Sequence, residues 1–193
     1  MINLKILVIS FLILIFGTSC NKTESEDPEV TYKFQLLNED KEPATVFAEG
    51  ENFFFHLVIE SDDPEWKFNR FLNKDPNFLR VYRIEEEEQI DIGVSFKSYW
   101  CETILYDCGH DVPYVFELPW VTEIGENEVP NQNVYPPFCM FNETDYLPKG
   151  KYVTYFDDRL EFVRCSEELE EGFYEKLFYT TELKHFEINF EIN

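Results

Sequence analysis

The residue best placed for a covalent modification is Cys20, which follows an apolar run and a group of small residues. The run extends from Ile6 to Phe16, Lys5 precedes it, and Gly17-Thr18-Ser19 stands directly before the cysteine. A positive residue, a short apolar stretch and a small-residue cleavage site are the parts of a secretory signal peptide. As a helix, this run would rise about 16 Å, against a hydrocarbon core of about 30 Å, so it is too short to span a membrane. We therefore expect residues 1–19 to be a signal peptide.

The same stretch resembles the lipobox of bacterial lipoproteins. That resemblance implies that Cys20 is lipidated, becomes the first mature residue and holds the protein to a membrane through its N-terminal lipid. An ordinary secretory signal followed by an unmodified Cys20 is the alternative that the residues leave open. Residues 20–29 are polar and acidic, which is typical of a disordered tether. Lys22 followed by Ser25-Glu26-Asp27 resembles the surface-export signal of some Gram-negative lipoproteins, which implies a surface-exposed protein on the outer membrane.

Four further cysteines follow, at positions 101, 108, 139 and 165. An even number of cysteines in an exported chain predicts disulfides. Three pairings are open, and we favour Cys101 with Cys108, because the intervening segment is short and ends beside Gly109. Cys139 would then pair with Cys165.

Two metal hypotheses compete with this view. Cys101, Cys108 and His110 could bind zinc, but their spacing is wider than that of the usual zinc pair. The run Glu85-Glu86-Glu87-Glu88 offers oxygen ligands for calcium, but no spaced Asp-x-Asp-x-Asp-Gly loop exists. We expect no metal and no other cofactor.

Aromatic side chains are the candidates for binding. They are Trp66, Tyr99, Trp100, Trp120 and Tyr135. If exposed on the edge of a sheet, such rings could stack on sugars or anchor a protein partner. The alternative interpretation places them in an aromatic core, because 18% of the residues are Phe, Trp or Tyr.

Charge excludes one class of partner. The chain has 16 basic and 39 acidic residues, and removal of residues 1–19 takes away one lysine, which leaves a net charge of −24. A surface with this charge repels phosphates, so we expect no binding to nucleic acid. The chain contains neither Gly-x-Ser-x-Gly nor His-Glu-x-x-His. We expect a protein that is not an enzyme.

The elements that must position these residues are strands. Apolar residues recur at period two, which is the pattern of a half-buried strand. This pattern predicts strands at 31–36, 45–48, 53–60, 66–72, 78–84, 89–96, 112–118, 151–156, 160–165 and 185–192. Pro113 favours an edge position for its strand. Asp157-Asp158-Arg159 predicts a hairpin turn, residues 121–138 a long loop, and residues 166–172 a short helical turn.

Three motifs carry a family resemblance. They are Phe34-Gln35-Leu36-Leu37-Asn38, Glu49-Gly50-Glu51-Asn52 before an apolar strand, and Leu147-Pro148-Lys149-Gly150-Lys151-Tyr152. They resemble immunoglobulin-like domains of bacterial surface lipoproteins, and they are also similar to the BsuPI-type proteinase-inhibitor domain. The resemblance covers the two ends of the mature chain and leaves residues 61–145 unmatched.

We therefore expect a signal peptide (1–19), an acidic tether (20–29) and one all-β domain (30–193), an immunoglobulin-like β-sandwich with long loop insertions. The function expected first is that of a noncatalytic binding module in the cell envelope, with an unknown protein or glycan as ligand. An exported protease inhibitor and a carbohydrate-binding or carbohydrate-active protein are the alternatives.

Overall fold

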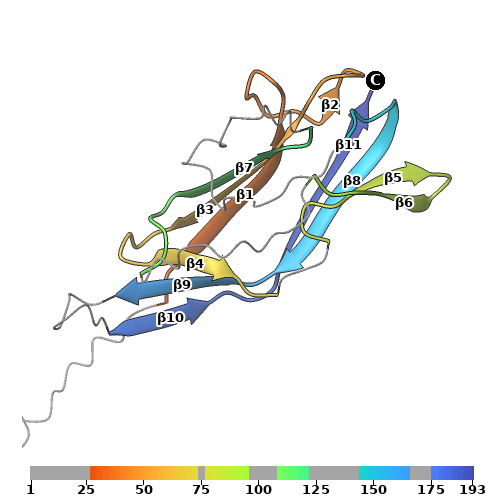
Figure 1. Cartoon of the computed structure of the whole chain (residues 1–193). Helices are drawn as coiled ribbons and strands as arrows, with labels where there is room; N and C mark the ends of the chain where they lie inside the picture. Colours follow the sequence, from red (N-terminus) through yellow and green to blue (C-terminus); the bar gives the residue numbers. More distant parts are fainter. Residues whose placement is uncertain (1–26, 74–76, 96–107, 122–143, 166–174) are drawn as a thin grey trace, which may run out of the picture.

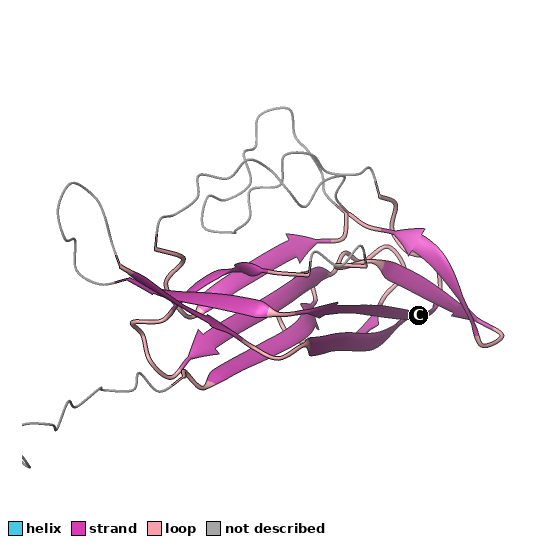
Figure 2. Ribbon diagram, turned by 90° about the horizontal axis from the view of Figure 1, so that it is seen from below, coloured by secondary structure: helices cyan, strands magenta, loops and turns pink. Residues whose placement is uncertain are grey.

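The computed structural model describes residues 27–73, 77–95, 108–121, 144–165 and 175–193. Every regular element in these ranges is a β-strand, as Figure 2 shows, so the predicted all-β class is confirmed. Within these ranges, no helix has the length and apolar character needed to cross a membrane.

Eleven strands form three sheets among the described residues. Their bounds are β1 (Val30–Leu37), β2 (Val46–Phe47), β3 (Phe54–Ser61), β4 (Lys67–Phe71), β5 (Val81–Glu85), β6 (Glu88–Gly93), β7 (Tyr114–Pro119), β8 (Gly150–Asp158), β9 (Leu160–Cys165), β10 (Lys176–Thr180) and β11 (Lys184–Ile192). The strand orders are β1-β3-β7, β10-β9-β4 and β2-β11-β8-β5-β6. All neighbours are antiparallel except β2 and β11.

The core lies between the sheet β1-β3-β7 and the five-stranded sheet. Phe55, Leu57 and Ile59 of β3 are fully buried, as the alternation of the sequence predicts. Phe34 of β1 makes an edge contact with Phe156 of β8, at a centroid distance of 5.4 Å. Phe156 in turn stacks on Phe186 of β11 at 4.5 Å. Aromatic rings therefore fill much of the space between these two sheets.

The register of the strands gives the domain two ends. At the first, which we call the proximal end, Val30 opens β1 opposite Ser61, and Lys184 at the start of β11 lies over the ring of Tyr32. At the second, the distal end, Leu37 closes β1 and Ile192 lies opposite Gly150. The described chain therefore enters the fold at the proximal end, and its C-terminus lies at the distal end (Figure 1).

The predicted hairpin between β8 and β9 is wrong. β8 pairs with β11 and β5, whereas β9 pairs with β10 and β4, so the chain passes from one sheet into another, as Figure 1 shows. The buried carboxylate of Asp158 stands at this transition. Its Oδ1 accepts hydrogen bonds from the backbone N–H groups of Leu72 (2.9 Å), Asn73 (2.7 Å) and Arg159 (2.7 Å). Asp158 thus satisfies backbone donors where the sheet ladders change partners.

Other strand predictions hold with shifted ends. β7 is an edge strand of its sheet, as Pro113 predicts. β10 was not predicted, because Leu177 and Phe178 are exposed and obscure the alternation. The predicted strand 89–96 is shorter, and Ile90 and Ile92 are exposed on it because β6 is also an edge strand. The predicted helical turn at 166–172 and nearly all of the loop 121–138 lie outside the described residues.

Candidate functional site

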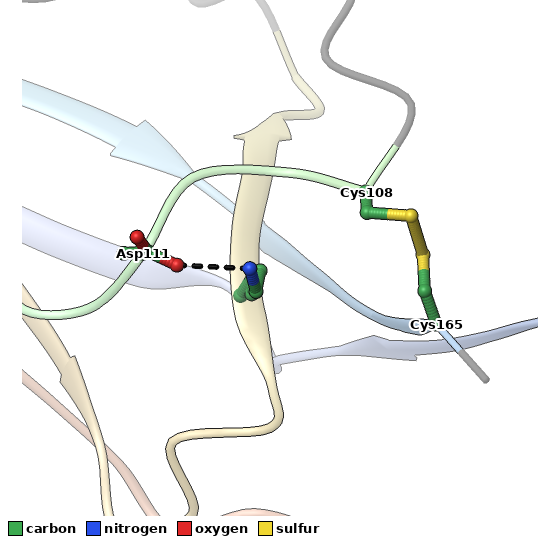
Figure 3. Close-up of a disulfide and its surroundings, with 4 residues drawn as sticks. Cys108, Asp111 and Cys165 are labelled. Carbon is green, nitrogen blue, oxygen red and sulfur yellow. Dashed lines mark ion pairs between the residues drawn. A yellow bond between two sulfur atoms is a disulfide. The ribbon is translucent and has the colours of Figure 1, made fainter. Parts of the chain in front are cut away.

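Cys108 and Cys165 form a disulfide, with 5.9 Å between their Cα atoms (Figure 3). The favoured pairing of Cys101 with Cys108 is therefore wrong, and so is that of Cys139 with Cys165. The short sequence distance was a poor guide, because β9 carries Cys165 to the segment that leads into β7. Cys101 and Cys139 lie outside the described residues.

The segment 108–111 packs closely on β4 and β9. Gly109 has a φ of +71°, and a Cβ atom there would lie 2.8 Å from Cγ1 of Val163 and 2.9 Å from the carbonyl oxygen of Phe68. Only glycine fits this backbone without displacing its neighbours. Asp111 forms an ion pair with Lys67 (2.9 Å), which Figure 3 shows beside the disulfide. The disulfide therefore closes a tightly packed junction.

The zinc hypothesis loses one of its ligands in this arrangement. Cys108 cannot bind zinc as a thiolate while its sulfur is bonded to Cys165. His110 is half-buried, and this burial lowers its pKa, although the neighbouring Asp111 opposes the shift. In the part of the chain that the structure describes, no group of three His, Cys, Asp or Glu residues could hold a metal ion.

The two described tryptophans belong to the core. Trp66 and Trp120 are each 2% exposed, so their assignment as exposed binding residues is wrong. Trp120 stacks on Phe53 with a centroid distance of 5.8 Å, and its Nε1 donates a hydrogen bond to the carbonyl oxygen of Asp145. Tyr99, Trp100 and Tyr135 lie outside the described residues. Nε1 of Trp66 is buried without a hydrogen-bond partner among the described residues, so at this position the large apolar area of the indole outweighs one unpaired donor.

A shallow cleft of about 290 Å³ lies on the five-stranded sheet near the distal end. It crosses β2, β11, β8 and β5, and it is lined by Thr45, Val46, Ile84, Lys151, Tyr152, Asn189, Phe190 and Glu191. Val46 is 57% exposed at one side of it. An ammonium, a carboxylate and a side-chain amide are thus combined with aliphatic groups, which suits a ligand with both polar and apolar parts. The sequence gives no signal for this cleft, because its residues come from four separate strands.

Two tyrosines extend the same face of the sheet. Tyr82 of β5 and Tyr155 of β8 are stacked, with ring centroids 5.2 Å apart. Partial burial and the neighbouring Tyr155 raise the pKa of Tyr82 to about 12. The Tyr155 hydroxyl also donates a hydrogen bond to Gln89 of β6 (3.2 Å). This face therefore presents a stacked aromatic pair, and the Tyr82 hydroxyl in it stays protonated at neutral pH.

His185 lies on β11, outside the cleft. Its Nδ1 is 2.7 Å from Oδ1 of Asp157, and its Nε2 is 3.3 Å from Oε2 of Glu187. These two hydrogen bonds to carboxylates raise the pKa of His185. The described partners of His185 are two carboxylates, so the three residues form an ion cluster at the surface of β11.

A second cavity, of about 380 Å³, lies at the proximal end. It is lined by Glu29, Thr31, Glu60, Ser61, Asp62, Pro64, Val112 and Pro113. The backbone N–H of Glu29 donates a hydrogen bond to Oδ1 of Asp62 (2.8 Å), which fixes the point where the chain enters the domain.

Comparison with known proteins returns no match to a family model, to a curated protein or to a solved structure.

Proposed function

We propose that this chain is a noncatalytic lipoprotein of the cell envelope that binds a ligand at the distal end of an immunoglobulin-like domain. One observation carries the proposal: the chain enters the domain at the proximal end, and the cleft around Lys151 and Asn189 lies toward the opposite end. With Cys20 lipidated and residues 20–29 as a tether, the proximal end faces the membrane. The cleft then points away from it, toward the medium outside the cell.

The membrane part of this proposal is tested with Cys20. Incorporation of labelled palmitate into the protein, and its loss in Cys20→Ala, are expected for a lipoprotein. Protease added to intact cells is expected to cut the domain if it is exposed at the surface. An unlabelled wild-type protein would contradict the anchor.

The binding part is tested by photo-crosslinking on intact cells. A crosslinking amino acid in place of Val46, beside the cleft, is expected to capture a discrete partner. The same amino acid in place of Leu183, which is 53% exposed directly before β11 at the proximal end, serves as the matched control. Equal capture at the two positions, or none at Val46, would contradict a distal binding site.

An exported protease inhibitor is a second candidate, and the segment 144–149 favours it. The Thr144 hydroxyl donates to the carbonyl oxygen of Trp120 (2.5 Å), and the Tyr152 hydroxyl donates to that of Pro148 (2.5 Å). Tyr146 is 44% exposed between these attachments. A loop held at both ends with an exposed aromatic residue is suited to a protease subsite. Undiminished activity of a protease panel in excess protein would exclude this function.

The carbohydrate alternative has lost two of its stacking residues, because Trp66 and Trp120 are buried. A glycan array remains its direct test. We expect no glycan bound in a manner that depends on either tryptophan.

A further inference from the structure

β6 is an edge strand, and its outer side has no neighbouring strand among the residues that the structure describes. It pairs with β5 on one side, and no other described strand pairs with it. Residues 88–92 are all exposed, and Figure 1 shows the β5–β6 hairpin projecting from the body of the domain. An edge of this kind offers a row of backbone N–H and C=O groups to another strand.

Two aliphatic side chains stand on this edge. Ile90 is 42% exposed and Ile92 is 39% exposed. Soluble proteins usually protect an edge strand with charged side chains, proline, a bulge or a covering segment. On β6, Glu88 and Asp91 supply charge, whereas Ile90 and Ile92 between and beside them leave apolar area exposed. A partner strand would bury both isoleucines and would supply the missing hydrogen bonds.

The charges on the hairpin select the kind of partner. Nη1 of Arg80 donates hydrogen bonds to both carboxylate oxygens of Asp91 (2.9 and 2.7 Å), which neutralises that charge. Nε of Arg83 lies 3.1 Å from Oε1 of Glu85. Glu86, Glu87 and Glu88 have no cationic partner among the described residues. A second copy of this acidic chain would bring like charges together, which disfavours self-pairing, whereas a basic segment would be attracted.

We propose that β6 binds an extended, basic segment of a partner protein as an added antiparallel strand. The register predicts the motif: apolar residues two apart face Ile92 and Ile90, and a lysine or arginine two residues later faces Glu88. The proposal goes beyond the distal site proposed above: it adds a second binding surface, on β6, with its own class of partner.

The test uses the full-length protein in detergent and a labelled peptide, Val-Thr-Val-Thr-Lys-Lys. Two further peptides carry glutamate in place of both lysines, or N-methyl groups at alternate backbone positions. We expect each change to weaken binding at least tenfold, because the first removes the charge attraction and the second removes ladder hydrogen bonds. High salt is expected to weaken binding of the basic peptide.

Variants of the protein locate the site. Ile90→Ser with Ile92→Ser, and Glu87→Gln with Glu88→Gln, are each expected to weaken binding at least fivefold. Val115→Ser and the pair Asp40→Asn with Glu182→Gln change exposed residues elsewhere and are expected to leave binding unchanged. Circular dichroism confirms that each variant is folded.

Three results would overturn the proposal. They are an absence of binding by the basic peptide, binding that is indifferent to Ile90→Ser with Ile92→Ser, and binding that N-methylation does not affect. A stable dimer whose contact is β6 would replace the proposed partner with a second copy. Crosslinking at Val46 tests the distal cleft independently of β6. If the peptide fails to bind β6 but Val46 still captures a partner, the β6 proposal is wrong and the proposed binding function stands.

Discussion

Cys108 and Cys165 are covalently joined although they are 57 positions apart in the chain. One cysteine lies before β7, an edge strand of the sheet β1-β3-β7, and the other ends β9, the central strand of the sheet β10-β9-β4. The disulfide therefore links two sheets near the proximal end. Gly109 and the Lys67–Asp111 ion pair hold the same junction.

Removal of this disulfide is expected to destabilise the domain. A closed loop of this length corresponds to about 4 kcal/mol in the chain-entropy account. The variant Cys108→Ala with Cys165→Ala should therefore unfold at a clearly lower guanidinium concentration than the wild type. The difference should vanish when both are unfolded under reducing conditions, and a residual difference there would assign the loss to packing.

Asp158→Ala is expected to be one of the most damaging single substitutions. It leaves the backbone N–H groups of Asn73 and Arg159 without their acceptor, whereas that of Leu72 still donates to the carbonyl oxygen of Arg159 (2.9 Å). The loss should be about 2–5 kcal/mol. Asp158→Asn keeps an oxygen acceptor and should cost less. Chemical denaturation measures both, and Arg159→Ala, at the exposed neighbour, is the control that should change stability little.

Trp120→Ala is expected to lower the free energy of unfolding and to leave the affinity for a ligand unchanged. The indole is buried against Phe53, so its removal leaves a cavity that should cost about 3–5 kcal/mol. Thermal unfolding measures the loss. If the variant kept wild-type stability but lost ligand binding, Trp120 would be a binding residue after all, contrary to the inference from its burial.

His185 is expected to make stability depend on pH. Its pKa is raised in the folded protein by Asp157 and Glu187, so folding favours the protonated form. This contribution is complete below the ordinary histidine pKa of about 6.5 and is lost as pH rises through the higher folded-state pKa. NMR titration should show the raised pKa and its decrease in Asp157→Asn. The stability of the wild type relative to His185→Gln should fall over the same pH range.

The β5–β6 turn is expected to accept a stabilising substitution. Glu86 and Glu87 form a two-residue loop between the paired Glu85 and Glu88, and both have positive φ values (47° and 73°). Asn-Gly is the favoured sequence for such a turn, so Glu86→Asn with Glu87→Gly should raise stability by about 1 kcal/mol. Removal of two glutamates also relieves repulsion within the run Glu85–Glu88. Salt screens that repulsion, so the gain in stability that persists in denaturation at high salt is the backbone effect.

The sequence predicted strands well where one face of a strand is buried. β3 and β11 alternate clearly, because Phe55 and Leu57 on one strand and Phe186 and Phe190 on the other face the core. Alternation failed at β10, whose Phe178 is 57% exposed, because an edge strand need not bury its apolar residues. The alternation also could not show that Ile90 is exposed, since the exposure of a side chain depends on which strands lie beside it.

The candidate site was predicted poorly for a related reason. Residue type alone selected Trp66 and Trp120, yet packing buries both, while Val46 and Lys151 line the cleft without any motif. The cysteine pairing failed in the same way, because sequence distance does not measure distance in space.

By itself, the sequence determined the all-β class, the positions of most strands and the acidic character of the chain, because alternation and charge are properties of neighbouring residues. Only the tertiary structure decided that β8 and β9 belong to different sheets, that Cys108 reaches Cys165, and that β6 has one neighbour among the described strands. The reason is that strand pairing is set by hydrogen bonds and burial between segments far apart in the chain.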